Sequence, residues 1–309
     1  MKIYNKIEEL IGNTPLLKVN NLIKELSLQA NLFVKLEMFN PAGSIKDRVA
    51  YKIIEDAENN GKIKKGGTII EATSGNTGIG LASIGISKGY KVIIVMPNSM
   101  SVERIKLIKS YGAEVVLTDG KLGMQGAVDK AIEINKNTPN SFIASQFENP
   151  SNVQAHYSTT AREIYLDLDK NVDFVVAGIG TGGTISGIGK FLKEQCDNIK
   201  IVGVEPYSSP LITKGVSGSH KIQGIGANFI PKIFDKTVVD EVFAVKDKDA
   251  IKFSRLLATK EGILAGFSSG ANLCVGIELA NRKENKGKNI VVILPDTGDR
   301  YLSTNLFLD

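Results

Sequence analysis

The stretch DFVVAGIGTGGTISG, residues 173–187, runs from an apolar segment through a glycine-rich loop into a helical pattern. The segment DFVVA is typical of a buried strand. Small residues after a strand let backbone N–H groups approach a phosphate at the N-terminus of the next helix. The hydroxyl groups of Thr181 and Thr184 add further donors. The stretch therefore predicts a strand–loop–helix unit that binds an unspecified phosphate group; the alternative is an ordinary tight turn.

The same alternation of strand and helix recurs along the chain. Strands are predicted at residues 32–36, 68–71, 91–96, 114–117, 173–177, 200–205 and 290–294. Helices are predicted at residues 45–60, 76–88, 102–110, 123–135 and 184–195. Buried strands that alternate with helices indicate parallel sheets covered on both faces, so we expect an α/β fold. A second small-residue loop, EATSGNTG at 71–78, also ends a strand, which suggests two sheets that face one cleft.

Composition narrows the class of protein. The 309 residues are enough for two α/β domains, and 42% hydrophobic with 23% charged residues is ordinary for a soluble globular protein. The net charge of +5 is spread among acidic residues, which is not the pattern of a nucleic-acid-binding surface. There is no run of 18 apolar residues, and the N-terminus MKIYNKIEEL lacks a signal-peptide core. We therefore expect a cytoplasmic protein without membrane partners.

Cysteine and histidine are scarce. Cys196 and Cys274 lie far apart without the spacing of a metal site, which favours a reduced, cytoplasmic setting. His156 and His220 are the only histidines in the sequence. Neither a metal site nor a histidine-based catalytic triad is expected, and both histidines are interpreted as structural.

One lysine has an unusual position in the segment NPAGSIKDR, residues 40–48. Gly43 and Ser44 are interpreted as a turn and a helix N-cap, which places Lys46 in the first helical turn. Helix-end N–H groups create positive potential there, so a cation is disfavoured unless it is neutralised, paired or converted into something else. An ion pair with Asp47 or an imine formed by the amine would remove the unfavourable charge. The alternative interpretation is that Lys46 is an ordinary lysine on the solvated surface.

The loop TSGNT, residues 73–77, offers hydroxyl, amide and helix-end N–H groups without an acid. That composition is typical of a site for a small carboxylate, although an N-cap cluster has it too. A phosphate loop, a carboxylate loop and an isolated lysine are what a pyridoxal-phosphate enzyme acting on an amino acid needs. The rival is an NAD-dependent oxidoreductase, because residues 178–183 fit G-x-G-x-x-G and Glu205 follows about twenty residues later.

Six ordered motifs of the chain resemble those of the cysteine synthase (O-acetylserine sulfhydrylase) and cystathionine β-synthase family of pyridoxal-phosphate enzymes. They are NPAGSIKDR, EATSGNTGIGLA, GIGTGGTISGIGK, HKIQGIGANFIP, GFSSGAN and LPDTGDRYLS, and they extend over essentially the whole chain. The resemblance implies fold type II, like the tryptophan synthase β-subunit, with two open, twisted, mostly parallel sheets flanked by helices. We expect a smaller mobile domain at 40–145, and a larger phosphate-binding domain formed by 1–39 and 146–309.

The resemblance also implies roles for individual residues. Lys46 would form the internal aldimine with pyridoxal 5′-phosphate and act as the catalytic base. The cofactor phosphate would be bound by Gly180, Thr181, Gly182, Gly183 and Thr184, the pyridine 3′-oxygen by Asn76, and Ser268 would face the pyridine nitrogen. The substrate carboxylate would be held by Thr73, Ser74, Thr77 and Gln146, with Asn76 and Asn228 as further substrate-binding residues.

The implied reaction is β-replacement on an O-acetylserine- or cysteine-type amino acid through an aminoacrylate intermediate. Asn228 departs from the family pattern, because cysteine-making members commonly have glycine there and cystathionine-making members an acidic residue. Its side chain would contact the amino group of a larger nucleophile or position water. L-Cysteine would then serve as donor, releasing hydrogen sulfide with lanthionine, serine or cystathionine as product. The alternative is that Asn228 is a neutral variation.

Further expectations rest on the resemblance alone. Relatives of this kind imply a homodimer, and some dock the C-terminal peptide of a serine acetyltransferase in the active-site cleft through its terminal carboxylate. The TSGNT loop is expected to move when it contacts the substrate carboxylate.

Overall fold

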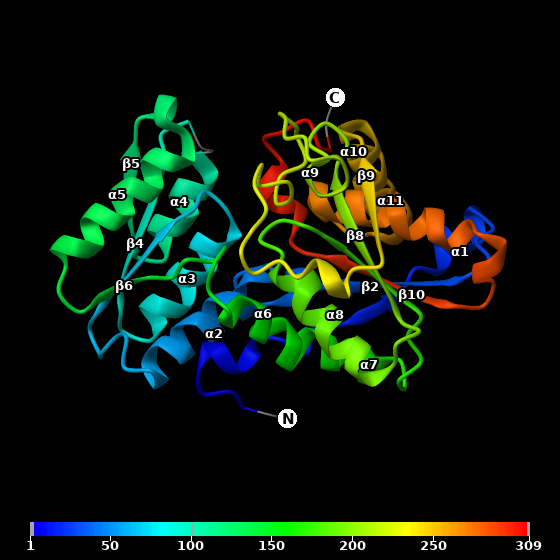
Figure 1. Cartoon of the computed structure of the whole chain (residues 1–309), viewed down its shortest axis with the longest axis horizontal. Coiled ribbons are helices and arrows are strands. Elements are labelled where there is room, and N and C mark those ends of the chain that lie inside the picture. Colours follow the sequence, from blue (N-terminus) through cyan, green and yellow to red (C-terminus); the bar gives the residue numbers. More distant parts are fainter. Residues whose placement is uncertain (1–2, 100–101, 308–309) are drawn as a thin grey trace. The chain divides into compact units, whose positions relative to one another are not determined.

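The computed structural model describes residues 3–99 and 102–307, which form two compact units (Figure 1). The first unit contains the residues up to Ile11 and Asn40–Asn152, and the second contains Gly12–Phe39 and the residues from Val153 onward. Each unit has its own sheet and its own apolar core. The α/β class predicted from the alternating pattern is therefore confirmed.

The sheet of the first unit is parallel throughout, with the order β5-β4-β3-β6. Its central strands, β3 and β4, are largely buried because helices cover both faces, which explains their nearly unbroken apolar sequences. The strands are β3 (Thr68–Ala72), β4 (Lys91–Pro97), β5 (Glu114–Thr118) and β6 (Ser141–Ile143).

Helices α2 and α3 of this unit pack closely against each other. A Cβ atom at Gly80 of α3 would lie 3.1 Å from the carbonyl oxygen of Lys46 and 3.2 Å from the Cβ atom of Ala50. Glycine at this position therefore allows α3 to approach the first turn of α2. The helices of the unit are η1 (Ile7–Leu10), α2 (Lys46–Asn59), α3 (Asn76–Ser87), α4 (Val102–Ser110), η3 (Gly120–Leu122) and α5 (Gly123–Asn137).

The sheet of the second unit has the order β1-β2-β10-β7-β8-β9, and β1 is its antiparallel edge strand. The other neighbouring strands pair in parallel, so their carboxyl ends share one edge. The strands are β1 (Leu16–Lys18), β2 (Asn31–Leu36), β7 (Phe174–Gly178), β8 (Lys200–Pro206), β9 (Glu241–Val245) and β10 (Asn289–Leu294).

Helix α11 (Phe267–Asn281) is buried along most of its length and lies in the apolar core of the second unit. The remaining α-helices are α1 (Asn20–Glu25), α6 (Ser151–Ala155), α7 (Ala161–Asp167), α8 (Gly183–Gln195), α9 (Leu211–Lys214) and α10 (Asp247–Leu256). Two π-helical segments, η4 (His156–Thr160) and η6 (Leu257–Glu261), and 3-10 turns at Glu37–Phe39, Lys236–Val238, Lys283–Asn285 and Gly298–Tyr301 complete the list. Among the described helices, none has both the length and the apolarity that a bilayer span requires.

The ends of the first unit differ from the expected domain of residues 40–145. The unit extends to Asn152 because Ser151 Oγ donates a hydrogen bond to Asp56 (2.7 Å), and Asn152 Nδ2 donates one to the carbonyl oxygen of Gln146 (2.8 Å). Ile11 packs on the core of the same unit, so the N-terminal residues belong with it. The mobility of this unit stays a prediction.

Candidate functional site

Lys46 is the first residue of α2, and the turn before it is held by side chains. Ser44 Oγ accepts a hydrogen bond from the N–H of Lys46 (3.2 Å), but Ile45 occupies the N-cap position, so the interpretation of Ser44 as the N-cap was wrong by one residue. The carboxylate of Asp47 accepts a hydrogen bond from the N–H of Ala42 (2.6 Å). Lys46 is half-buried between two buried neighbours, so it is not a solvated surface lysine.

The TSGNT loop joins β3 to α3 and brings together the predicted carboxylate-binding side chains of this unit. Thr73 Oγ1 accepts a hydrogen bond from the N–H of Gly75 (3.2 Å), and Thr77 Oγ1 donates one to Gln146 Oε1 (2.5 Å). Asn76 is the first residue of α3, so helix-end N–H groups lie in the same loop. The arrangement can bind a small anion.

Two residues that the sequence reasoning missed support this loop. Arg104 Nη1 donates a hydrogen bond to the carbonyl oxygen of Ser74 (3.1 Å). Glu71, with 2% exposure, accepts hydrogen bonds from the N–H groups of Ser145 (2.8 Å) and Gln146 (3.2 Å). Burial raises the pKa of Glu71 to about 7, against the lowering effect of these hydrogen bonds. An acidic residue in an otherwise buried strand, just before the loop, was the available signal.

The second predicted loop joins β7 to α8 and is shaped by glycine. Gly182 has a φ of +81° and a Cβ atom there would lie 2.7 Å from Phe234 Cβ. A Cβ atom at Gly180 would overlap the carbonyl oxygen of Gly224. Thr181 Oγ1 accepts a hydrogen bond from the N–H of Gly183 (3.4 Å), at the N-terminus of α8. This close-packed backbone at a helix N-terminus suits a phosphate group.

Ser268 and the loop around Gly224 lie next to this glycine loop. Ser268 is buried in the first turn of α11, and a Cβ atom at Gly224 would lie 3.5 Å from Ser268 Oγ. Since Gly224 also contacts Gly180, the second unit brings the predicted phosphate-binding residues and Ser268 into one neighbourhood.

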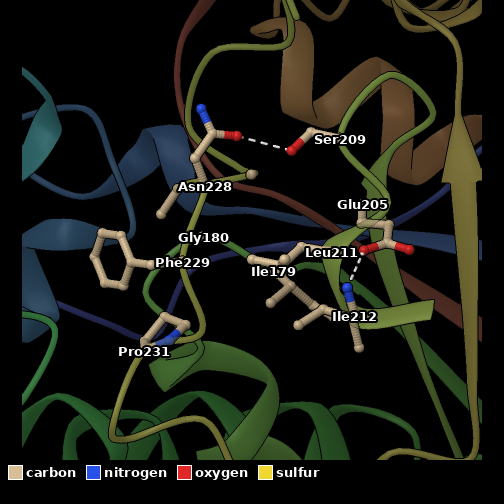
Figure 2. A pocket seen from close by; sticks show the side chains of 11 residues that line it. Ile179, Gly180, Glu205, Ser209, Leu211, Ile212, Asn228, Phe229 and Pro231 are labelled. Carbon is tan, nitrogen blue, oxygen red and sulfur yellow. Dashed lines mark hydrogen bonds between the residues drawn. The ribbon is translucent and has the colours of Figure 1, made fainter. Parts of the chain in front are cut away.

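Asn228 lies in a small pocket of the second unit (Figure 2). Its Oδ1 atom accepts a hydrogen bond from Ser209 Oγ (2.8 Å), and its φ of +63° is in the left-handed region that favours glycine or asparagine. Ser209 is 1% exposed, and its Oγ accepts a hydrogen bond from the N–H of Gly218 (3.2 Å). The hydroxyl proton of Ser209 is therefore used on the amide oxygen, and the amide N–H groups of Asn228 are left as donors.

Glu205, the residue that favoured a ribose site, serves a structural purpose. It is buried and accepts a hydrogen bond from the N–H of Ile212 (2.8 Å; Figure 2). It also accepts hydrogen bonds from the N–H (3.2 Å) and the hydroxyl (2.5 Å) of Thr213. These bonds satisfy the first turn of α9. The carboxylate of Glu205 is thus already hydrogen-bonded within the protein. The NAD-dependent alternative therefore lacks the acidic residue that would bind a ribose.

The predicted site residues fall into two groups. Lys46 and the residues proposed for the substrate carboxylate belong to the first unit; the glycine loop, Asn228 and Ser268 belong to the second. An amine at a helix start, an anion-binding glycine loop and a neutral hydroxyl are the groups that pyridoxal 5′-phosphate requires, so the residues present fit this cofactor. That the two groups face one cleft stays a prediction.

Comparison with known proteins agrees with this chemistry. Residues 7–296 match the family model described as pyridoxal-phosphate dependent enzyme. The chain is 55% identical over 307 residues to cysteine synthase B of Campylobacter jejuni, covering 99% of this chain and 100% of that protein. It is similar to the crystal structure of a cysteine synthase from Entamoeba histolytica (TM-score 0.96, 46% identity, 99% and 91% covered). A hydrogen sulfide-producing enzyme from Fusobacterium nucleatum is also similar (TM-score 0.92, 49% identity, 97% and 100% covered).

Proposed function

This chain belongs to the family of pyridoxal-phosphate dependent enzymes, and we propose that it catalyses β-replacement on a small amino acid in the manner of a cysteine synthase. Its cofactor is pyridoxal 5′-phosphate. The observation that carries the proposal is the position of Lys46, half-buried at the start of α2 and next to the helix that begins at the TSGNT loop. The fold and the cysteine synthase relatives support the same reaction type.

The side chains of the first unit bind the substrate and move its proton. When bound, the cofactor supplies an electron sink for the electron pair left at the substrate Cα. Lys46 Nζ removes the Cα proton, because the positive potential of the helix N-terminus favours the neutral amine over the ammonium. The hydroxyl groups of Thr73, Ser74 and Thr77, with Gln146 and the N-terminus of α3, hold the substrate carboxylate. The β-substituent then leaves and a nucleophile takes its place.

The side chains of the second unit hold the cofactor. The glycine loop from Gly180 to Thr184 would bind the phosphate through its backbone N–H and hydroxyl groups. Ser268 would hydrogen-bond the pyridine nitrogen, and a hydroxyl would not hold that nitrogen protonated as a carboxylate would. Asn76 would donate a hydrogen bond to the pyridine 3′-oxygen.

O-Acetylserine as donor and sulfide as acceptor are the first choice of substrates, by similarity to cysteine synthases. The alternative is L-cysteine as donor, with release of hydrogen sulfide, and the similarity to the enzyme from Fusobacterium nucleatum favours testing it. The hydrogen bond of Asn228 narrows the choice of the acceptor substrate. Because its amide oxygen accepts from Ser209, the remaining N–H groups suit a carboxylate or a water molecule and not the amino group that we expected.

Lys46 is tested by locating the cofactor in the holoenzyme. Reduction of the purified protein with borohydride, followed by peptide mass analysis, should place the cofactor on Lys46. Lys46→Ala should lose the visible absorbance of the bound cofactor and all turnover, whereas the exposed control Lys62→Ala should keep both. Attachment to another lysine would contradict the proposal.

The substrates are tested by product analysis in parallel reactions. Wild type and Asn228→Gly are supplied with O-acetylserine plus sulfide, and with L-cysteine alone. If Asn228 helps to bind the acceptor, the glycine variant should release less sulfide from L-cysteine and form a different proportion of lanthionine and serine. Equal rates and equal products in both variants would make Asn228 a neutral variation.

A cytoplasmic homodimer completes the proposal, supported by the family resemblance. Cys196 and Cys274 are both free thiols, as a reducing compartment would keep them. Sedimentation at micromolar concentration should give the mass of a dimer, and a monomer mass would contradict it. Binding of a serine acetyltransferase C-terminal peptide should compete with the amino-acid substrate, because both present a carboxylate to the TSGNT loop.

A further inference from the structure

A fully buried histidine lies between two threonine hydroxyls in the second unit. His156, in the π-helical segment η4, has an exposure of 0%. Its Nδ1 atom is 3.0 Å from Thr160 Oγ1, and its Nε2 atom is 3.2 Å from Thr184 Oγ1. Helix α8 packs closely on η4, since a Cβ atom at Gly187 would lie 2.8 Å from the Cβ atom of His156. The imidazole is thus held beside the first turn of α8, where the proposed phosphate loop ends.

The chemistry of the phosphate decides the direction of these hydrogen bonds. A phosphate group that carries negative charge accepts hydrogen bonds, so Thr184 must donate its hydroxyl proton to bind one. Thr184 Oγ1 can then only accept from Nε2 of His156, which must carry a proton. A neutral imidazole has one donor and one acceptor nitrogen, so Nδ1 accepts from the hydroxyl of Thr160. The two hydrogen bonds of His156 and the proposed one to the phosphate then run in the same direction, from Thr160 through His156 and Thr184 to the phosphate.

Burial and the nearby N-terminus of α8 favour the same state. An imidazolium at this position would be fully buried and would add positive charge beside helix-end N–H groups that already create positive potential. It would also place a proton on Nδ1, so the hydroxyl of Thr160 would have to turn from donating to accepting. The neutral imidazole is compatible with the hydroxyl groups of both Thr160 and Thr184.

We propose that His156 is a positioning residue for the cofactor phosphate: it holds the neutral Nε2–H tautomer and fixes Thr184 with its hydroxyl proton directed to the phosphate. The inference rests on the proposed function, because it takes Thr184 as a phosphate ligand. Donation from Thr184 to the phosphate selects the tautomer of His156, and the hydroxyl of Thr160 then stabilises that tautomer by donating to Nδ1.

The tautomer is measured directly by ¹H–¹⁵N NMR of the holoenzyme. The sequence contains only His156 and His220, so a His220→Gln variant assigns the two sets of ring resonances. The expected pattern for His156 is a protonated Nε2 and an unprotonated Nδ1. A protonated Nδ1, alone or together with Nε2, would overturn the proposal, and this result does not depend on the folding of any His156 variant.

The effect on the phosphate is measured by cofactor titration and by ³¹P NMR of the bound cofactor. His156→Leu should weaken cofactor binding about tenfold and shift the phosphorus resonance, because the hydroxyl of Thr184 loses its fixed orientation. His156→Gln keeps an N–H donor and should stay within about threefold of wild type. A His156→Leu variant that folds and binds the cofactor with wild-type affinity and an unchanged resonance would overturn the proposal.

A double-mutant cycle separates this proposal from the proposed function. If His156 acts through Thr184, adding His156→Leu to Thr184→Val should weaken cofactor binding no further. If the two losses add, His156 is structural and the inference fails, while the phosphate loop stands. If neither Thr184→Val nor Gly180→Ala affects cofactor binding, the phosphate is not bound by this loop and the proposed role of the loop fails.

Discussion

The two candidate loops of this protein occupy equivalent places in their own sheets but are built by different means. Each follows a buried parallel strand and leads into a helix. In the glycine loop, Gly180 and Gly182 have no room for a side chain, and Gly182 has a left-handed backbone. In the TSGNT loop, Gly75 has an ordinary φ of −116° and its nearest neighbour would be 3.9 Å from an added Cβ atom.

The difference matches what each loop is proposed to bind. A phosphate is held by backbone N–H groups, so the backbone must have one fixed shape, and close packing provides it. A substrate carboxylate arrives and departs in every turnover, and the TSGNT loop is proposed to bind it with side-chain hydroxyl groups. That loop is supported from behind by Glu71 and Arg104 through hydrogen bonds, which can rearrange at lower cost than a packed backbone.

The largest effect is expected for Gly180→Ala. The added methyl group would overlap the carbonyl oxygen of Gly224, and overpacking of this kind costs about 1–3 kcal/mol. If that cost falls on the loop, cofactor affinity should decrease about ten- to hundredfold, as measured by titration of the apoenzyme. An unchanged affinity would show that the loop is not held by close packing.

The next effect concerns the pH dependence of stability through Glu71. Its folded-state pKa of about 7 is above the ordinary value of 4.5, so the folded protein binds this proton more tightly than the unfolded chain. The stabilisation is fully present below about pH 4.5 and is lost as the pH rises to about 7. Glu71→Gln should therefore gain roughly 1–3 kcal/mol in unfolding free energy relative to wild type between pH 4.5 and 7.5.

Urea unfolding of both proteins at a series of pH values measures this difference. The variant also loses one acceptor for the N–H groups of Ser145 and Gln146, so a constant offset between the two curves is expected. The titration of the Glu71 carboxyl group is seen only in how the difference between the two unfolding free energies changes with pH. Parallel curves would mean that Glu71 titrates alike in the folded and unfolded states.

A smaller effect is expected for Thr77→Val, which keeps the shape of the side chain and removes its hydrogen bond to Gln146. The loss of one such bond costs about 1 kcal/mol, which corresponds to roughly a fivefold increase in KM for the amino-acid substrate. Cofactor affinity should stay the same, because this side chain is in the carboxylate loop. Steady-state kinetics and cofactor titration of the same preparation test both statements, and a loss confined to cofactor binding would reverse the assignment of the two loops.

The smallest effect is expected for Gly75→Ala, the matched control for Gly180→Ala. The φ of −116° is accessible to alanine, and no atom would come closer than 3.9 Å. Alanine is a poorer N-cap than glycine, so we expect a loss of about 1 kcal/mol in unfolding free energy and cofactor affinity within about threefold of wild type. A loss as large as that of Gly180→Ala would remove the distinction between the two loops.

The secondary structure that the sequence predicted is confirmed where apolar runs are strong. The seven predicted strands and five predicted helices are present with ends that differ by at most two residues. Strands β1 and β6 were missed because they have three residues each, and their pairing depends on neighbours in the sheet. Helix α11 was missed because it is buried on almost every side, so its sequence has no clear amphipathic period.

The sequence alone determined the fold class and the order of the site motifs, because these depend on residue types at short spacings. It gave the reaction type through the resemblance of those motifs to the cysteine synthase family. The tertiary structure decided which hydrogen bonds each side chain makes. Ser145 is 74 residues from Glu71, Thr184 is 28 residues from His156, and Asn228 is 19 residues from Ser209. No local pattern encodes such partners, since a hydrogen bond needs atoms within about 3 Å, and only the packing of whole elements brings distant side chains that close.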